Sequence, residues 1–448
     1  MYRAITVNKY KDLIMAAQDY IFHHPETGYK EWKTGRYMEE AFEKLGYTLT
    51  RAESIPGFYT VLDTGREGPE VLILGELDSI ICREHPCADR ETGAAHACGH
   101  SAQCAALLGI AAVLKEKDAL DGLSGRIRLC AVPAEELIEI EYRTRLQRDG
   151  VIKYLGGKSE FLHRGYFDGV DMAFMVHTAP GEYFAAKAGA IGCITKSIIY
   201  KGVSAHAGGC PWDGCNALYA ATQGISAANA LRETFRDSDM IRFHPIMTAG
   251  GDAVNAIPDR VVIESYVRGV SFPAILDANR RINRALCGGA LSLGANVDIR
   301  DMPGYAPLHN APAMISLAKD AAAALDLPYA CDDTISTGCT DMGDLSVLMP
   351  VVHPYAPGAV GLSHGADYMI EDPELACVSS AAWQLEMLRL LLENGAARAK
   401  EILASFTPAF SSKQAYFDYI DAFTAQGDRI DYRDGRACVT LSADTANI

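Results

Sequence analysis

The sequence has no excess of basic side chains and no long apolar run. Its 448 residues include 41 lysines and arginines against 57 aspartates and glutamates, a formal net charge of −16. Phosphate backbones and anionic membranes require a basic surface, so we expect neither a nucleic-acid partner nor a membrane partner. Every apolar stretch is clearly shorter than the 18 residues of a membrane span, and the N-terminus resembles an amphipathic helix rather than an export signal.

The chain also lacks the cysteine pattern of disulfide-stabilised proteins. Its 13 cysteines are an odd number, and they are scattered along a long sequence. Because no export signal accompanies them, we interpret them as reduced thiols in a cytoplasmic protein.

The composition provides for a large core, since 49% of the residues are hydrophobic and 22% are charged. A chain of this length favours two domains. Apolar strands alternate with helices in residues 1–188 and again after 304, which is typical of a mostly parallel sheet with helices on both faces. We therefore predict an α/β domain of residues 1–188 and 304–448, interrupted by an inserted ferredoxin-like (α+β) lid of residues 189–303 with the order β-α-β-β-α-β. The expected elements include strands at 71–78, 126–133 and 170–177, and helices at 7–22, 101–117 and 374–404.

The segment AHACGHSAQ, residues 95–103, places Cys98 and His100 just before a predicted helix. The loop and the helix N-terminus favour a negatively charged thiolate. A thiolate and an imidazole at this short spacing are suitable ligands for a divalent metal ion. A buried cysteine beside a capping histidine would give the same pattern, so this segment alone leaves both interpretations open.

Three further segments carry groups that can bind metals. VPAEE ends in Glu135 and Glu136 after a predicted strand, MVH ends in His177, and GLSH ends in His364 within a glycine-rich loop. Of two adjacent carboxylates, one can ligate a metal while the other accepts a proton from water. Taken singly, the groups are explained as well by an acidic turn and two ordinary histidines. Strand ends meet at one edge of an open α/β sheet, however, and that favours a common site.

Together these segments resemble the dinuclear-metal aminoacylase and carboxypeptidase superfamily. The similarity points to its branch of hippurate hydrolases and indole-acetyl-amino-acid hydrolases, and there to the aminobenzoyl-glutamate hydrolase type. The motifs that carry the resemblance are HHPETGYKE (23–31), LGELDS (74–79), HACGH (96–100), PAEE (133–136), VDMAFMVH (170–177), GVSAHA (202–207), GGDAVNAIPD (250–259), TDMGDLS (340–346) and GLSH (361–364).

The resemblance implies a role for each residue of the site. Glu135 matches the general base, which activates water and then protonates the leaving amine. Asp78 matches an acidic residue that orients the site from outside the ligand shell. The residues that match ligands of two divalent metal ions per subunit are Cys98, His100, Glu136, His177 and His364.

The same resemblance implies a substrate-binding lid. His206 matches a histidine that contacts the substrate carbonyl or carboxylate and takes part in catalysis. Asn255 and Arg268 match positions that bind the free carboxylate of the amino-acid portion. In several similar enzymes the matching histidine reaches across a dimer, so we expect a homodimer formed through the lid.

The chain departs from the family pattern at four places. Ser101 and Gln103 stand where aspartate and histidine usually follow HACGH, and Glu76 stands where aspartate is usual. Residues 137–165 are longer and more highly charged than the short glycine-rich stretch of the family. These departures bear on substrate preference more than on the presumed ligands, all of which are present.

The implied activity is that of a metal-dependent, metallopeptidase-like amidohydrolase. Metal-activated water would cleave the amide of a small-molecule substrate, an N-acyl or N-aroyl amino acid or an unusual dipeptide. Zinc, manganese, cobalt and nickel all suit a site of thiolate, imidazole and carboxylate. Two alternatives remain. The first is a cysteine hydrolase with Cys98 as nucleophile and His100 as base, but it leaves Glu135, Glu136 and His177 unexplained. The second is a non-catalytic metal-binding protein of the same fold.

Overall fold

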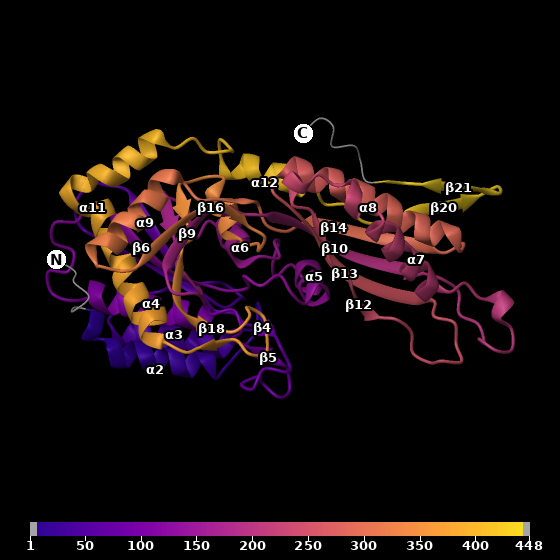
Figure 1. Cartoon of the computed structure of the whole chain (residues 1–448), viewed down its shortest axis with the longest axis horizontal. Coiled ribbons are helices and arrows are strands. Elements are labelled where there is room, and N and C mark those ends of the chain that lie inside the picture. The colour runs from indigo at the N-terminus through magenta and orange to yellow at the C-terminus, as the bar shows by residue number, and fades with distance from the viewer. Residues whose placement is uncertain (1–6, 442–448) are drawn as a thin grey trace. The chain divides into compact units, whose positions relative to one another are not determined.

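The apolar segments at 71–78, 126–133 and 170–177 pair in parallel, as predicted, in a computed structural model that describes residues 7–441. The contacts divide these residues into two units. Unit 1 comprises residues 7–189, 308–336 and 340–411, and unit 2 comprises residues 190–307, 337–339 and 412–441. Figure 1 shows the elements of both.

The main sheet of unit 1 has six strands in the order β1-β2-β6-β3-β7-β17. Its central members are parallel, and β3 is buried along its whole length, as expected for a strand covered on both faces. The antiparallel edge formed by β1 and β2 was not predicted. The strands are β1 (Thr50–Arg51), β2 (Phe58–Asp63), β3 (Glu70–Glu76), β6 (Arg126–Val132), β7 (Met172–Phe174) and β17 (Val351–Val352).

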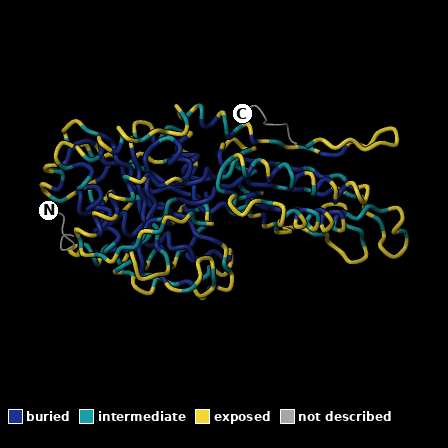
Figure 2. The backbone as a smooth tube through the Cα atoms, turned by 45° about the horizontal axis from the view of Figure 1, so that its top comes forward, coloured by how far each residue is buried: buried dark blue, intermediate teal, exposed yellow. Residues whose placement is uncertain are grey.

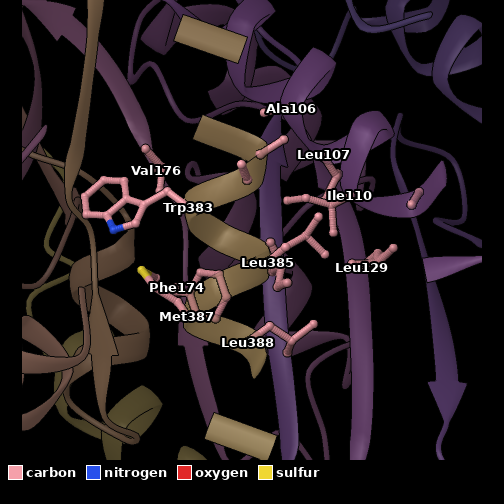
Figure 3. Close-up of a cluster of buried hydrophobic side chains, with 14 of the residues drawn as sticks. Ala106, Leu107, Ile110, Leu129, Phe174, Val176, Trp383, Leu385, Met387 and Leu388 are labelled. Carbon is pink, nitrogen blue, oxygen red and sulfur yellow. The ribbon is translucent and has the colours of Figure 1, made fainter. Parts of the chain in front are cut away.

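The helix α4 (His100–Leu114) is the centre of the core of unit 1. Every one of its residues is buried, and beyond the first turn, which holds His100, Ser101 and Gln103, its sequence is apolar on all sides. It packs against β3 and against three other helices, α2 (Lys11–Phe22), α3 (Trp32–Lys44) and α11 (Ser380–Ser405). Figure 3 shows how side chains of α4 and α11 gather in one cluster with those of β6 and β7.

The helix predicted at 374–404 is broken near its middle. Residues Glu393 to Ala396 leave helical backbone angles, with positive φ at Asn394, Gly395 and Ala396. Asn-Gly is a typical helix stop, so the sequence contained the signal. The stretch Glu374–Ser405 has the length and apolar composition of a membrane span, but 78% of its most apolar window is buried inside the structure, as in a core helix.

A second sheet of unit 1 was not predicted. It joins β8 (His177–Pro180), β9 (Phe184–Ala190) and β18 (Tyr355–Val360) with three further strands. These strands mix small, polar and glycine residues, so neither alternation nor an apolar run marks them in the sequence. The further strands are β15 (Leu308–His309), β16 (Tyr329–Ser336) and β19 (Met369–Ile370).

Unit 2 has the predicted ferredoxin-like order. An antiparallel sheet β11-β13-β10-β14, with β12 on β13, is covered on one face by two helices (Figure 1). The third element of that order is divided into two short strands, β11 and β12, with His244 and Pro245 between them. The elements are β10 (Gly192–Lys201), α7 (Ala217–Asn229), β11 (Arg242–Phe243), β12 (Ile246–Ala249), β13 (Arg260–Gly269), α8 (Phe272–Ser292) and β14 (Asn296–Pro303).

The C-terminal residues correct the predicted division of the chain, which placed all of 304–448 with the α/β domain. Residues 412–441 pack with unit 2 instead, and Asp301 exchanges backbone hydrogen bonds with Ala425. The segment thereby covers the edge of β14, whose unpaired backbone groups would otherwise be open. It comprises α12 (Lys413–Asp421) and the hairpin β20 (Ile430–Arg433) and β21 (Arg436–Val439), which is exposed along most of its length (Figure 2).

Residues 137–165 form two short helices of unit 1, α5 (Ile140–Arg148) and α6 (Gly157–His163). All of α6 except its last residue is buried. The segment is therefore part of the core as well as of the surface.

Candidate functional site

Three neighbouring strands of the main sheet deliver the polar side chains to one edge. Asp78 follows β3 by two residues, Glu135 and Glu136 follow β6, and His177 follows β7. These strands run parallel, so their carboxyl ends meet at the same edge, where open α/β sheets build their sites.

The turn before α4 is held in an unusual conformation. Gly99 has φ +104, and a Cβ there would lie 2.5 Å from the Tyr368 hydroxyl oxygen and 3.0 Å from the Thr178 carbonyl oxygen. Only glycine is tolerated in so close a space at this backbone angle. The Tyr368 hydroxyl lies within hydrogen-bonding distance of the Cys98 carbonyl (3.1 Å), and the amide of His364 donates to the carbonyl of Ala97 (2.8 Å). The loop that carries His364 is thereby fastened to the loop that carries Cys98.

Cys98, His100 and His177 form what we call the inner group, whose ligand atoms lie within 4.8 Å of one another. The Nδ1 atom of His100 lies 3.0 Å from the Asp78 carbonyl oxygen, and that of His177 lies 2.8 Å from the Thr178 carbonyl oxygen. A carbonyl oxygen can only accept a hydrogen bond, so each Nδ1 is the donor and each Nε2 faces the cluster. The Nε2 atom of His177 is 3.4 Å from the sulfur of Cys98.

Cys98, Glu136 and His364 form the outer group, which meets the same distance criterion. The Nε2 atom of His364 is 3.0 Å from a Glu136 carboxylate oxygen. The His364 side chain is 52% exposed, whereas that of His100 is 1% exposed. Cys98 belongs to both groups, so its sulfur is placed to be shared by two ions.

Asp78 connects the two groups. One carboxylate oxygen lies 3.2 Å from the Nδ1 atom of His100, and the other accepts a hydrogen bond of 2.8 Å from the amide of Glu136. The residue is fully buried. It therefore contacts a side chain of the inner group and the backbone of the outer group at once.

The two adjacent glutamates have opposite electrostatic environments. Burial, together with the carboxylates of Glu76, Glu136 and Asp341, raises the pKa of Glu135 well above its usual range. Burial acts in the same direction on Glu136, but the imidazoles of His364 and His100 outweigh it and hold the pKa of Glu136 well below its usual range. One carboxylate is suited to exchange protons and the other to remain an anion, which is the division that acid–base sites require.

The thiol of Cys98 is also adjusted by its neighbours. Burial and Glu136 act to raise its pKa, but His100 and His177 outweigh them and lower the pKa to about 6. The group is therefore a thiolate at neutral pH, the form that binds metals. In the described part of the chain, the buried Nε2 atom of His100 makes no hydrogen bond, and its charged neighbours are the carboxylates of Glu76 and Glu135. A thiolate, three imidazoles and a carboxylate fit a pair of divalent metal ions.

A family model described as Peptidase family M20/M25/M40 matches residues 72–389. The chain belongs to this family. The resemblance inferred from the motifs is thereby confirmed, and the predicted enzyme class, a hydrolase of amide bonds, agrees with it.

The chain is similar in sequence to hydrolases with several different names. It is 28% identical to the Xaa-Arg dipeptidase of Mus musculus over 61% of this chain and 60% of the mouse protein, so this chain spans less than two thirds of that relative. It is 27% identical to the N-acetyl-L-cysteine deacetylase of Bacillus subtilis over 69% of this chain and 72% of that protein. Its fold is similar to that of a dinuclear metal-binding peptidase of the M20 family from Bacillus subtilis, with a TM-score of 0.63 and 20% identity over 86% of this chain and 99% of the other.

Two of the departures from the family pattern are in contact in this M20 chain. The Gln103 side-chain amide donates a hydrogen bond of 2.9 Å to the Glu76 carboxylate, and both residues are buried beside His100. The same Glu76 oxygen lies 3.2 Å from the Nε2 atom of His100. The two changes therefore form one local arrangement, a relation that the sequence alone did not show.

The lid residues lie in unit 2, at opposite ends of its sheet. His206 follows β10, Asn255 precedes β13, and the two are linked by the hydrogen bond from the Ala207 amide to the Asn255 carbonyl (2.9 Å). Arg268 is near the far end of β13, opposite Cys193 at the start of β10. Arg268 is eight residue steps along β13 from Arg260, which corresponds to about 27 Å. The structure therefore brings His206 and Asn255 together but not Arg268.

Sequence reasoning missed several buried groups around the site. Lys158 forms ion pairs with Glu76 and, at 2.5 Å, with Asp341. The Arg143 guanidinium donates to the carbonyls of Ala134 and Glu136, which flank the first glutamate. Asp341 lies in the motif TDMGDLS, so that motif contained a signal, whereas Lys158 and Arg143 lie in the segment that departs from the family.

Proposed function

We propose that the protein is a cytoplasmic amidohydrolase that depends on two divalent metal ions. The inner and outer groups would hold the ions, with Cys98 as the shared ligand and Glu135 as the general base. The observation that carries this proposal is the shared sulfur between two ligand groups with Glu135 directly beside them. Zinc, manganese, cobalt and nickel are the candidates for the metal, since the donor set suits each of them.

When bound, the ions would supply Lewis-acid activation, which lowers the pKa of water from 15.7 to about 7 and polarises a carbonyl. Glu135 would take the proton from the attacking water and return it to the leaving nitrogen as the C–N bond breaks. Its raised pKa suits a group that must accept and release a proton near neutral pH. Asp78 would hold His100 and the backbone of Glu136 in place during both steps.

The substrate class that we propose is an N-acyl or N-aroyl amino acid or an unusual dipeptide. The names of the relatives, a dipeptidase and an N-acetyl amino-acid deacetylase, support amides of this size. His206 suits the recognition of a carbonyl or carboxylate oxygen. Its Nδ1 atom accepts from the amides of Gly208 and Gly209, so its exposed Nε2 carries the proton.

The test is a hydrolysis screen of N-acyl amino acids, N-aroyl amino acids and dipeptides, with each of the four metals added to chelator-treated protein. We expect hydrolysis that a chelator abolishes and that metal restores. Chelator-resistant hydrolysis that thiol alkylation abolishes would instead establish the cysteine hydrolase, for which the thiolate of Cys98 is the favourable observation. Metal binding without hydrolysis of any substrate would indicate the non-catalytic alternative.

We further propose a homodimer in which His206 serves the partner's site. His206 follows the end of β10 that pairs with Arg260, whereas Arg268 lies near the opposite end of β13. The eight strand steps from Arg260 to Arg268 correspond to about 27 Å, so we infer that His206 and Arg268 of one lid are too far apart to touch one small substrate. Two copies of the lid resolve this, because each site can take Arg268 from one copy and His206 from the other. The strand β12 is exposed along its whole length, so the sheet has an edge that a second copy can cover.

A mixing experiment tests the exchange. Glu135→Ala and His206→Ala should each be nearly inactive as pure proteins. A mixed dimer would contain one site with both substitutions and one site with neither, so part of the activity should return. If mixed dimers are confirmed by mass and no activity returns, each His206 serves its own subunit and the exchange is wrong.

A further inference from the structure

The residues around His100 contain a third group that could compete for metal. Ligand atoms of Glu76, His100 and Glu135 also lie within 4.8 Å of one another, and all three residues are buried. An ion in this group would occupy Glu135, which the proposed reaction needs for proton transfer. It would also withdraw His100 from the inner group. A metal enzyme with this geometry therefore requires something that keeps Glu76 from acting as a ligand.

Lys158 is placed for that purpose. Its ammonium group is completely buried, and it contacts one oxygen of Glu76 and one oxygen of Asp341. The backbone amide of Lys158 donates to the other oxygen of Asp341 at 2.8 Å, so Asp341 fixes both ends of the lysine. The second oxygen of Glu76 accepts the hydrogen bond from Gln103. Both oxygens of Glu76 thus have donors supplied by the protein.

We propose that Lys158 is a positioning residue that keeps metal out of the group formed by Glu76, His100 and Glu135. By neutralising Glu76 it directs the ions to the two groups that share Cys98 and leaves Glu135 available to the substrate. The inference rests on the proposed metal-dependent function. It also gives a role to the unusual segment 137–165, since α6 of that segment carries the lysine into the core.

The test replaces Lys158 and follows cobalt. A cobalt ion bound to a thiolate has a sulfur-to-metal charge-transfer absorption, whereas an ion held by Glu76, His100 and Glu135 has none. In Lys158→Met we expect cobalt to bind while this absorption per bound cobalt falls, and kcat to fall about 10–100-fold with little change in KM. Lys158→Gln, which keeps hydrogen-bond donors but removes the charge, should show the same pattern if the methionine variant does not fold.

Two double variants show whether Lys158 acts by keeping Glu76 from binding metal or only by balancing a buried negative charge. Lys158→Met with Glu76→Gln and Lys158→Met with Asp341→Asn each remove one cation and one anion. Only the first removes the competing ligand, so only the first should restore the thiolate absorption and most of the kcat. Equal rescue by both would show that the lysine merely balances charge, and rescue by neither would show that it merely packs. Either result overturns the proposal.

Lys196→Met is the matched control for the loss of a buried lysine. Lys196 is also completely buried and pairs with Asp301 and Asn279, but it lies in unit 2 and outside every candidate ligand group. It should lower the melting temperature and leave the cobalt spectrum of the folded protein unchanged. Failure of the wild-type protein to bind cobalt would refute the proposed function itself. Wild-type behaviour of Lys158→Met in a cobalt-binding, active enzyme would refute only the role of the lysine.

Discussion

The inner and outer groups share one sulfur but differ in how firmly their other ligands are held. Both histidines of the inner group have their Nδ1 atoms fixed by carbonyl oxygens, and His100 is fully buried. The outer group ends in His364, which is half-exposed and has a positive φ of 66° on a glycine-rich loop. Ligands oriented by a rigid outer shell bind metals more tightly. The difference predicts one firmly held ion and one that exchanges more readily.

The largest effect is expected from a change of Cys98, which belongs to both the inner and the outer group. Cys98→Ser should lose both ions, because a hydroxyl is a much poorer ligand than a thiolate. Two bound ions would supply several kcal/mol of transition-state stabilisation, so activity should fall about 10³-fold or more. Elemental analysis of the purified variant checks the prediction, and full occupancy would show that the sulfur is only structural.

Glu135→Gln should stop turnover while both ions stay bound, because this residue belongs to neither the inner nor the outer group. Loss of the proton carrier should cost about 10²–10⁴-fold in kcat. The check is kcat together with metal content, with Asp344→Asn as a control for a buried acid that lies outside the ligand groups. A loss of metal in the glutamine variant would contradict the assignment.

His364→Ala and His177→Ala should separate the two ions. Removal of His364 should release the outer ion and keep the inner one. Removal of His177 should weaken the inner ion, and a competing chelator should then extract it at a lower concentration than from the wild-type protein. Each change should cost more than the 10–100-fold that is typical of residues outside the ligand shell. If both variants lose both ions together, the groups act as one site and the comparison fails.

The smallest expected effect is the dependence of metal binding on pH. The carboxylate of Glu136 raises the pKa of His364 to about 11, so at pH 7–8 an incoming ion must displace its proton. Burial acts to lower the pKa of His100, but Glu76 and Cys98 outweigh it and raise that pKa well above its usual value. Binding of both ions should therefore release about two protons per subunit and weaken as pH falls. Calorimetry in buffers of different ionisation enthalpy measures the release, and His364→Ala should lower it by about one proton.

The sequence predicted the features that rest on local patterns. Continuous apolar strands such as 71–78 mark the main sheet, and the polar residues that follow them meet at its edge because the strands are parallel. The Asn-Gly pair at 394–395 was also readable as a helix stop, and the prediction of a continuous helix there was wrong. The second sheet of unit 1 has no such pattern, since its strands are short and rich in small residues.

Contacts between distant parts of the chain were not predictable. Lys158 and Asp341 are 183 positions apart, and no local sequence pattern in either segment indicates that the two side chains are in contact. The contact between Glu76 and Gln103 was equally hidden, although the sequence singled out both residues. Each was noted as a separate departure from a family pattern, whereas in the fold they are one hydrogen-bonded pair. The influence of residues 137–165 on substrate preference stays a prediction. The buried side chains of Arg143 and Lys158 show that the segment also belongs to the core of unit 1.

The spread of the ligands along the chain has a consequence for the timing of assembly. Cys98 and His364 are separated by more than half of the sequence, and β17, the last strand of the main sheet, is formed by residues 351 and 352. At about 5–20 residues per second, a ribosome finishes His364 roughly 15–50 s after Cys98. During that interval the thiol of Cys98 is already synthesised, whereas His364 is not. A growing cell deprived of reductant should therefore accumulate oxidised Cys98 in newly made protein before it does so in mature protein.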